Sequence, residues 1–499
     1  MPRLDWVCIF AAVGAVIMGI LTLYGGGGFG ETLAIKKIIW LILGLILMFS
    51  LSMVNYQRIG FYSVVLYAIG IFLLLMVLVP FLGTKVKGAR SWIRFFGFGF
   101  QPAEYMKLAL VIMLSRYIIL RENEIGKLKE LIIPFLLTII PVSLIIIQPD
   151  LGSAVLFLPI LFSLLFIGGA NTSVIFGMAI IGFATLFIPM YLEYHKYILV
   201  DDIYEILIES NYKLAEAVRF LNFEVWQAID KAKSGLVESG NWAENYLSQP
   251  ENFTLLTNAV QIAFEQKSNF FRDLFSNDMA NIILISIGTI AYGISLLAAF
   301  MSRYKGYRKF ATVSLIFTLS IASAFSFRKF VSFKPHQVVR IVSFANPDKF
   351  PKGAGYQLRH ALITVGSGKL MGKGMSQGDM TRGETPYLPE WYNDFIFAVI
   401  GEQFGFFGVM FTLILLFTVI LRGIQISLQS KDDFGSMLAG GITALFFFHI
   451  MINIGINIGL LPVTGITLTF VSAGGSNLLM SFAGLGILMN IYSRKYINA

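Results

Sequence analysis

The sequence predicts an all-α polytopic membrane protein, and two observations carry this prediction. Of the 499 residues, 56% are hydrophobic and only 13% are charged, whereas soluble domains carry about 25% charged residues. The apolar residues are gathered in about twelve runs that are long enough to cross a bilayer as helices. Helices satisfy their own backbone hydrogen bonds in lipid, and the pattern lacks the short alternating segments of an outer-membrane barrel.

The apolar runs divide the chain into three membrane regions. About seven fall in an N-terminal core at 1–192, about two in an added pair at 282–327, and about three in a C-terminal core at 394–499. No convincing cleavage site follows the first run, which is therefore expected to stay as a span. The runs lie near 6–24, 36–54, 61–81, 104–120, 131–147, 152–169, 174–192, 282–301, 310–327, 394–421, 436–457 and 476–492.

Lysine and arginine in the short loops predict the orientation, because cytoplasmic loops carry an excess of both. Alternate loops are basic if the N-terminus is inside, which also puts the C-terminus in the cytoplasm. The net charge of +9 is scattered over these loops and indicates no nucleic-acid partner. The single cysteine, Cys8, excludes an internal disulfide. The inside basic residues are Arg58, Arg121, Lys127, Lys129, Arg303, Lys305, Arg308, Lys309, Arg422, Lys431, Arg494 and Lys495.

One loop on the expected outer side is also basic, since it contains Lys85, Lys87, Arg90 and Arg94. Arginine and lysine together suit a phosphate group. The loop is therefore a candidate anion-binding surface. The alternative is a short loop without a function, whose charges do not set the orientation because the neighbouring loops determine it.

Residues 193–281 differ in composition from the membrane runs. About 14 of the 29 acidic residues of the chain fall there, against about seven basic ones, and apolar residues recur at helical spacing. We expect an acidic helical insertion outside the membrane, which serves as an interaction or spacing module. The apolar residues are Leu214, Val218, Leu221, Val225 and Ile229, and then Leu256, Val260, Phe264, Phe271 and Leu274.

The strongest candidate for chemistry is Asp394, which ends the outer loop 328–393 and begins an apolar run that reaches Arg422. A carboxylate deep in lipid costs about 2.5–3.5 kcal/mol, so a carboxylate at this position indicates a functional role. The loop before it is rich in glycine at 353–355 and 366–374, where backbone N–H groups can approach an anion closely.

Three further polar groups interrupt the apolar background. Glu104 and Lys107 are three residues apart on one helix face, either as a structural ion pair or as part of a polar cavity. Asp150 follows a helix-breaking proline and can cap the next helix. Ser472 and Ser476 lie in an irregular Gly/Pro/Ser segment, where they either bind substrate or satisfy freed backbone groups. The four histidines show no metal-ligand spacing and are expected to pack.

Taken in order, seven motifs resemble the SEDS family of bacterial cell-wall polymerases, whose members include RodA, FtsW and SpoVE. The match covers nearly the whole chain except about 193–309. The motifs are GAR-W at 88–92, FQPAE with Lys107, QPDLGSA at 148–154, NPDKFPKGAGYQ, GSGKLMGKG, LPEWYNDFIFAVIGEQFG and GLLPVTGITLTFVSAGGSN.

The resemblance implies about ten core transmembrane helices of SEDS type, here with about two extra. It implies a peptidoglycan glycosyltransferase of the bacterial inner membrane that acts on lipid II, with a class B penicillin-binding protein as partner. Its essential aspartate falls on Asp394. The substrate-binding positions that it suggests are Arg90, Glu104, Lys107, Asp150, Ser472 and Ser476, to which we add Lys85 and Lys87.

The expected mechanism makes Asp394 the general base on an acceptor sugar hydroxyl, with the cations holding the diphosphate leaving group. A divalent cation, magnesium or manganese, could assist, but no motif fixes one. The alternatives are a lipid II flippase and a scaffold for a transpeptidase. The short tails favour the elongation branch, RodA, over the division branch, FtsW.

Overall fold

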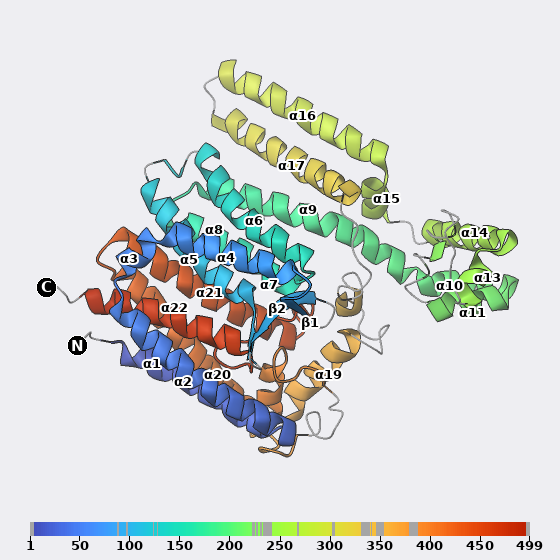
Figure 1. The fold of residues 1–499 in the computed structure, drawn as a ribbon. Coiled ribbons are helices and arrows are strands. Elements are labelled where there is room, and N and C mark those ends of the chain that lie inside the picture. The colour runs from blue at the N-terminus through green and yellow to red at the C-terminus, as the bar shows by residue number, and fades with distance from the viewer. Residues whose placement is uncertain are drawn as a thin grey trace. The chain divides into compact units, whose positions relative to one another are not determined.

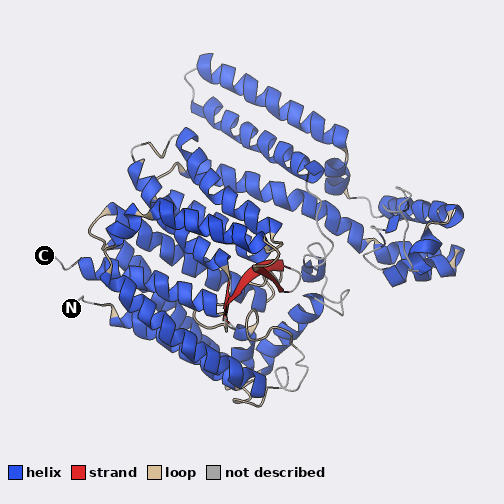
Figure 2. Cartoon of the chain, viewed as in Figure 1, coloured by secondary structure: helices blue, strands red, loops and turns tan. Residues whose placement is uncertain are grey.

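The structure is a computed structural model that describes residues 4–86, 89–95, 98–122, 124–126, 128–221, 225, 228–229, 232, 242–266, 269–301, 305–330, 340, 342–345, 354–378 and 388–495. Within these ranges, eight helices are long and apolar enough to cross a membrane. Two shorter apolar helical segments, Ser63–Leu78 and Gly152–Ile167, add to them. The prediction of an all-α, multi-pass membrane protein is confirmed (Figure 2).

The chain forms two compact units. Unit 1 contains 1–175 and 347–499, and unit 2 contains 176–346. Each of the twelve apolar runs expected from the sequence falls on a helix in one of these units (Figure 1).

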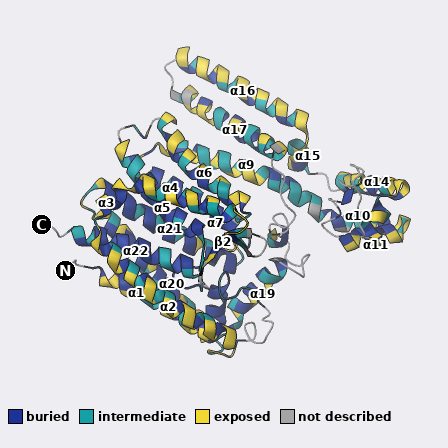
Figure 3. Cartoon of the chain, in the orientation of Figure 1, coloured by how far each residue is buried: buried dark blue, intermediate teal, exposed yellow. Residues whose placement is uncertain are grey.

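The helices of unit 1 form the membrane core. The central ones, α5, α21 and α22, are largely buried, because they pack against one another (Figure 3). The outer ones, such as α2 and α4, keep exposed apolar faces. The bounds are α1 Trp6–Tyr24, α2 Gly28–Met53, α3 Tyr56–Phe61, α4 Ser63–Leu78, α5 Pro102–Leu120, α6 Ile132–Ile147 after a 3₁₀ turn at Leu128–Leu131, α7 Leu151–Val155, α8 Phe157–Ile167, α19 Ala354–Ser367, α20 Ile396–Leu428, α21 Asp433–Asn457 and α22 Gly475–Arg494.

The loop between α4 and α5, which the sequence predicts to lie on the outer side, contains a small antiparallel sheet that the sequence did not predict. Its strands are β1 (Gly83–Val86), β2 (Ala89–Phe95) and β3 (Phe98–Phe100), in the order β1-β2-β3. In the register, Thr84 faces Trp92 and Ile93 faces Phe100. Strand β3 leads directly into α5, so the sheet is attached to the start of a central helix.

Helix α20 is broken at Gly405, where φ is 66° and ψ is −163°. The segment after α19 fills the break: Lys373 N donates to Glu402 O at 2.8 Å, and Phe406 N donates to Lys369 O at 2.9 Å. Gly372 N and Gly374 N also donate to carbonyl oxygens of the protein. The glycine-rich segment thus uses these N–H groups internally, whereas the sequence suggested that they approach an anion.

Unit 2 holds the acidic insertion and the added helix pair. The insertion has a buried core of its own, which includes Leu214, Val218, Leu221, Val225 and Leu256, in agreement with the helical spacing. Phe271 is 60% exposed and lies outside this core. Helices α16 and α17 pack side by side. The bounds are α9 Thr172–Ile198, which begins in unit 1, α10 Val200–Ser210, α11 Tyr212–Leu221, α13 Trp242–Leu247, α14 Pro250–Gln266, α15 Phe270–Ser276, α16 Asp278–Met301 and α17 Lys305–Phe330.

Candidate active site

Asp394 lies in the turn just before α20, and its side chain is 7% exposed. Two amides of α21 hold its backbone: Asn453 Nδ2 and Asn457 Nδ2 donate to the Asp394 carbonyl at 3.0 and 2.8 Å. Asn457 Oδ1 accepts from Ala398 N at 3.0 Å, which satisfies one of the free N–H groups at the start of α20. The main chain around Asp394 is therefore fixed from α21.

The segment that follows α21, residues 458–474, forms a non-helical loop against this turn, and we call it the inner loop. A Cβ built on Gly465, whose φ is 81°, would lie 3.7 Å from Asp394 Oδ2, so the carboxylate faces this glycine. A Cβ on Gly152 would collide with the Thr464 carbonyl, so the inner loop also contacts the start of α7. Irregular backbone at membrane depth persists only where protein or a cavity surrounds it.

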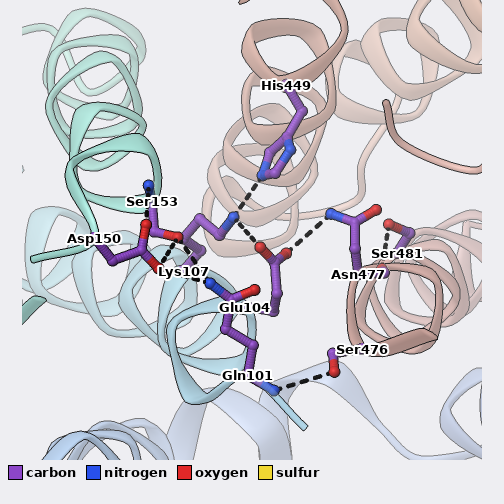
Figure 4. Close-up of polar contacts among 9 residues, drawn as sticks. All are labelled: Gln101, Glu104, Lys107, Asp150, Ser153, His449, Ser476, Asn477 and Ser481. Carbon is purple, nitrogen blue, oxygen red and sulfur yellow. Dashed lines mark hydrogen bonds and ion pairs between the residues drawn. The ribbon is translucent and has the colours of Figure 1, made fainter. Parts of the chain in front are cut away.

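A buried polar network joins the three central helices next to the inner loop (Figure 4). Lys107 Nζ donates to Glu104 Oε1 at 2.7 Å and lies 2.7 Å from His449 Nε2. Asn477 Nδ2 donates to Glu104 Oε2 at 2.9 Å. Lys107 is 1% exposed and Glu104 8%. The pairing expected from the spacing of Glu104 and Lys107 is thus present, and α21 and α22 each contribute a further partner.

Asp150 caps α7, since its Oδ1 accepts from Ser153 N at 3.1 Å. Its Oδ2 accepts from Gln101 Nε2 at 2.8 Å and from Ser153 Oγ at 2.9 Å. Gln101 is the N-cap residue of α5, so these bonds connect Asp150 to the helix that carries Glu104 and Lys107 (Figure 4).

The two serines bond backbone groups in this structure. Ser472 Oγ donates to Asn393 O at 2.6 Å and accepts from Leu468 N at 2.8 Å, so it ties the inner loop to the residue before Asp394. Ser476 Oγ donates to Gly99 O at 3.0 Å and accepts from Gln101 N at 3.1 Å. The sequence left two roles open for these serines, namely substrate binding and satisfying freed backbone groups. The contacts in the structure correspond to the second role.

The structure describes some of the basic residues in the loop between α4 and α5. Arg90 lies on β2, and its Nη1 donates to Leu78 O at the end of α4 at 3.4 Å. The main chain of Lys85 lies on β1, while its side chain and the whole of Lys87 lie outside the described residues.

Tyr392 lies two residues before Asp394. Burial and the neighbouring negative charges of Glu390 and Asp394 raise its pKa. The phenol stays protonated in the physiological range and donates to the Glu390 carboxylate. Within the described ranges, no group of three or more His, Cys, Asp or Glu side chains could hold a metal ion, and a divalent cation stays a prediction.

Sequence reasoning missed the polar face of α21. His449, Asn453 and Asn457 recur every four residues in an apolar helix, which places all three on one face. That spacing was visible and indicates a polar face inside a membrane protein. His449 was expected only to pack, yet it contacts Lys107. Lys37 was also missed, because nothing in the sequence told it from the neighbouring Lys36.

The profile of the cell cycle protein family FtsW/RodA/SpoVE matches residues 3–218 and 270–497 of this chain. Among curated proteins, peptidoglycan glycosyltransferase RodA of Treponema pallidum is 28% identical over 498 residues, with 98% of each chain covered. Stage V sporulation protein E of Bacillus subtilis is 27% identical over 462 residues, which covers 92% of this chain and 87% of the relative.

The fold is also similar to solved structures. One belongs to work described as "Structural coordination of polymerization and crosslinking by a peptidoglycan synthase complex". Its chain matches with a TM-score of 0.58 at 21% identity, and 99% of each chain is covered.

Proposed function

This chain belongs to the FtsW/RodA/SpoVE family of cell cycle proteins, and we propose that it is a peptidoglycan glycosyltransferase that polymerises lipid II into β-1,4-linked glycan. The single observation that carries the proposal is the fixed position of Asp394. Its buried carboxylate faces Gly465, and two asparagines hold its main chain. A general base needs such a fixed position, because proton abstraction requires hydrogen-bond reach.

In the proposed reaction, Asp394 takes the proton from the 4-hydroxyl of the acceptor N-acetylglucosamine. The acceptor oxygen forms a bond with the anomeric carbon of the donor N-acetylmuramic acid. The bond from that carbon to the diphosphate oxygen breaks, and undecaprenyl diphosphate leaves with the electron pair. One displacement inverts the α-linked donor into a β-linked product.

We assign the diphosphate to the cationic side chains. Arg90, with Lys85 or Lys87, suits its two phosphates, and Lys107 adds a positive charge beside Glu104. Asp150, Ser472 and Ser476 are proposed to line the substrate site, and they hold its backbone through the bonds described above. In a site that excludes water, such charges act more strongly than in bulk solvent.

We further propose the bacterial inner membrane as the location, with both termini in the cytoplasm and Asp394 at the outer face. A class B penicillin-binding protein is the proposed partner, supported by the similarity to a chain of a peptidoglycan synthase complex. The elongation branch is favoured over the division branch, because a RodA protein is 28% identical over 98% of both chains, whereas an FtsW protein with almost the same coverage is 23% identical.

The test is polymerisation of lipid II by the purified full-length protein. Asp394→Asn should reduce the rate about 10²–10⁴-fold, since that is what a general base contributes. Glu31→Gln is a matched control, because it neutralises an exposed carboxylate in the first turn of α2. Normal glycan chains from Asp394→Asn would refute the proposal. Lipid translocation into vesicles without polymer, by wild type and variant alike, would indicate a transporter instead.

A further inference from the structure

Lys37 occupies an unusual place for a lysine. It lies within the membrane-spanning helix α2, and its side chain is 1% exposed. Most of α2 is exposed, and Lys37 lies on its one buried face, with Ala34, Gly44 and Met48. A charged side chain within a membrane span is costly and is retained for a function.

The side-chain amine of Lys37 donates a hydrogen bond to the backbone carbonyl of Val471, in the inner loop. The contact depends on Gly19 of α1, because a Cβ at that position would overlap both Lys37 Nζ and Val471 O. The absence of a side chain at Gly19 thus leaves the space in which Lys37 reaches Val471.

Further contacts connect Val471 to the candidate base. The next residue, Ser472, donates to Asn393 O at 2.6 Å, and Ala473 N donates to Tyr392 O at 3.0 Å. Asn393 directly precedes Asp394. Three successive residues of the inner loop are therefore bonded either to α2 or to the turn that carries Asp394.

A second contact with α2 lies at the other end of this short segment. Gly475 begins α22, and a Cβ there would overlap the indole of Trp40. Trp40 is three residues after Lys37, so the two side chains leave neighbouring positions on the same helix face. The segment from Val471 to Gly475 is thus held against α2 at both of its ends.

We propose that Lys37 is a positioning residue for the transferase reaction: it fixes the Val471–Ala473 segment, and this segment fixes the main chain before Asp394. The inference rests on the proposed role of Asp394 as general base. Lys37 acts through the loop and touches neither substrate nor the reacting atoms in this scheme. Its effect is therefore expected on kcat, because misplacing a catalytic group by about 1 Å costs about 10²-fold in rate.

The experiment measures kcat and KM for lipid II with the purified full-length protein. Lys37→Met keeps an unbranched side chain, one atom shorter, and removes the donors. It should lower kcat by about tenfold to a hundredfold while KM changes by less than about twofold. Lys36→Met is the matched control, since Lys36 is the adjacent lysine and is exposed, and it should leave both constants unchanged.

A double variant separates positioning from general damage to the fold. If Lys37 acts through the loop, Lys37→Met combined with Ser472→Ala should be no slower than the slower single variant. Wild-type kcat in Lys37→Met would overturn the proposal. So would losses that multiply in the double variant, or a loss that only follows the folded fraction in thermal unfolding.

Two further variants keep the outcome decisive. If Lys37→Met does not fold, Gly19→Ala tests the same contact from α1 and should lower kcat in the same way; wild-type kcat in that variant would overturn the proposal. Asp394→Asn is assayed in parallel. If it is inactive and Lys37→Met is not impaired, the positioning inference alone fails. If Asp394→Asn is fully active, the proposed base fails, and the inference falls with it.

Discussion

The side-chain amide of Asn457 donates a 2.8 Å hydrogen bond to the backbone carbonyl of Asp394, although 63 residues separate the two in sequence. Because the amide binds the carbonyl, it orients the turn without occupying the carboxylate. The same side chain accepts from Ala398 N, in the first turn of α20. Asn457 therefore joins the end of α21 to the candidate base and to the first turn of α20.

We predict that Asn457→Leu lowers kcat for lipid II polymerisation by about tenfold to a hundredfold. The substitution also removes the acceptor of the buried Ala398 N–H, which costs about 1–3 kcal/mol of stability, while Asn453 still donates to the Asp394 carbonyl. Steady-state kinetics and thermal unfolding of the purified variant measure the two effects separately.

Asn490→Leu is the control for this prediction. Asn490 is a buried amide that donates to Ser52 O at 2.6 Å and accepts from Tyr56 N at 3.0 Å, so it also holds backbone groups. Its loss should lower the unfolding temperature and leave kcat per folded molecule unchanged. Equal kcat losses in the two variants would argue against a specific role for Asn457.

The ion pair of Glu104 and Lys107 leads to a prediction about stability. Glu104→Gln leaves the Lys107 ammonium without its carboxylate, and breaking a buried pair from one side costs about 3–5 kcal/mol. The double variant Glu104→Gln/Lys107→Met removes both charges and should be more stable than Glu104→Gln alone. Thermal unfolding in detergent measures all of these variants against wild type.

The double variant should nevertheless be a poor enzyme if Lys107 helps to hold the diphosphate. A stable double variant with normal KM and kcat would leave the pair with a structural role only. Stability losses that simply add would contradict the coupling seen in the 2.7 Å contact.

The break in α20 predicts that a glycine-to-alanine substitution lowers stability more at Gly405 than within a regular helix. Gly405 has φ 66° and ψ −163°, a conformation that is essentially restricted to glycine, and a Cβ there would overlap Gly372 N. We expect Gly405→Ala to cost at least about 1–3 kcal/mol in strain. Gly293→Ala, on α16 with open space around it, should be neutral or stabilise the helix by up to about 1 kcal/mol. Comparable unfolding temperatures for the two variants would show that α20 is not broken at this residue.

The membrane helices could be predicted because length and composition alone determine which segments can span a bilayer. The pair Glu104 and Lys107 could also be predicted, since the pitch of one helix brings residues three apart together. Asp394 was identified as a carboxylate at the start of an apolar run. In each case the signal is local in sequence.

The missed features depend on distant parts of the chain. The break at Gly405 lies in a run that the sequence predicts as one span, and residues 369–374 bond to the backbone at the break. The bond from Gln101 to Asp150 joins two helix starts 49 residues apart. Lys37 and Lys36 have the same side chain, and only the position of the inner loop gives them different surroundings.

The side of the membrane on which Asp394 lies can be tested by cysteine labelling. The chain has a single cysteine, so one substitution removes all native thiols. Cys8 is fully buried, so Cys8→Ser provides a cysteine-free background. Met371→Cys introduces a thiol at a position that is 77% exposed, between α19 and Asp394. Lys431→Cys introduces a thiol at an exposed position between α20 and α21.

An impermeant maleimide is then applied to intact cells or spheroplasts. It should label Met371→Cys directly, and it should label Lys431→Cys only after the membrane is opened, because one span separates the two sites. The reverse pattern would place Asp394 on the cytoplasmic side, where a base could not act on precursors at the outer face.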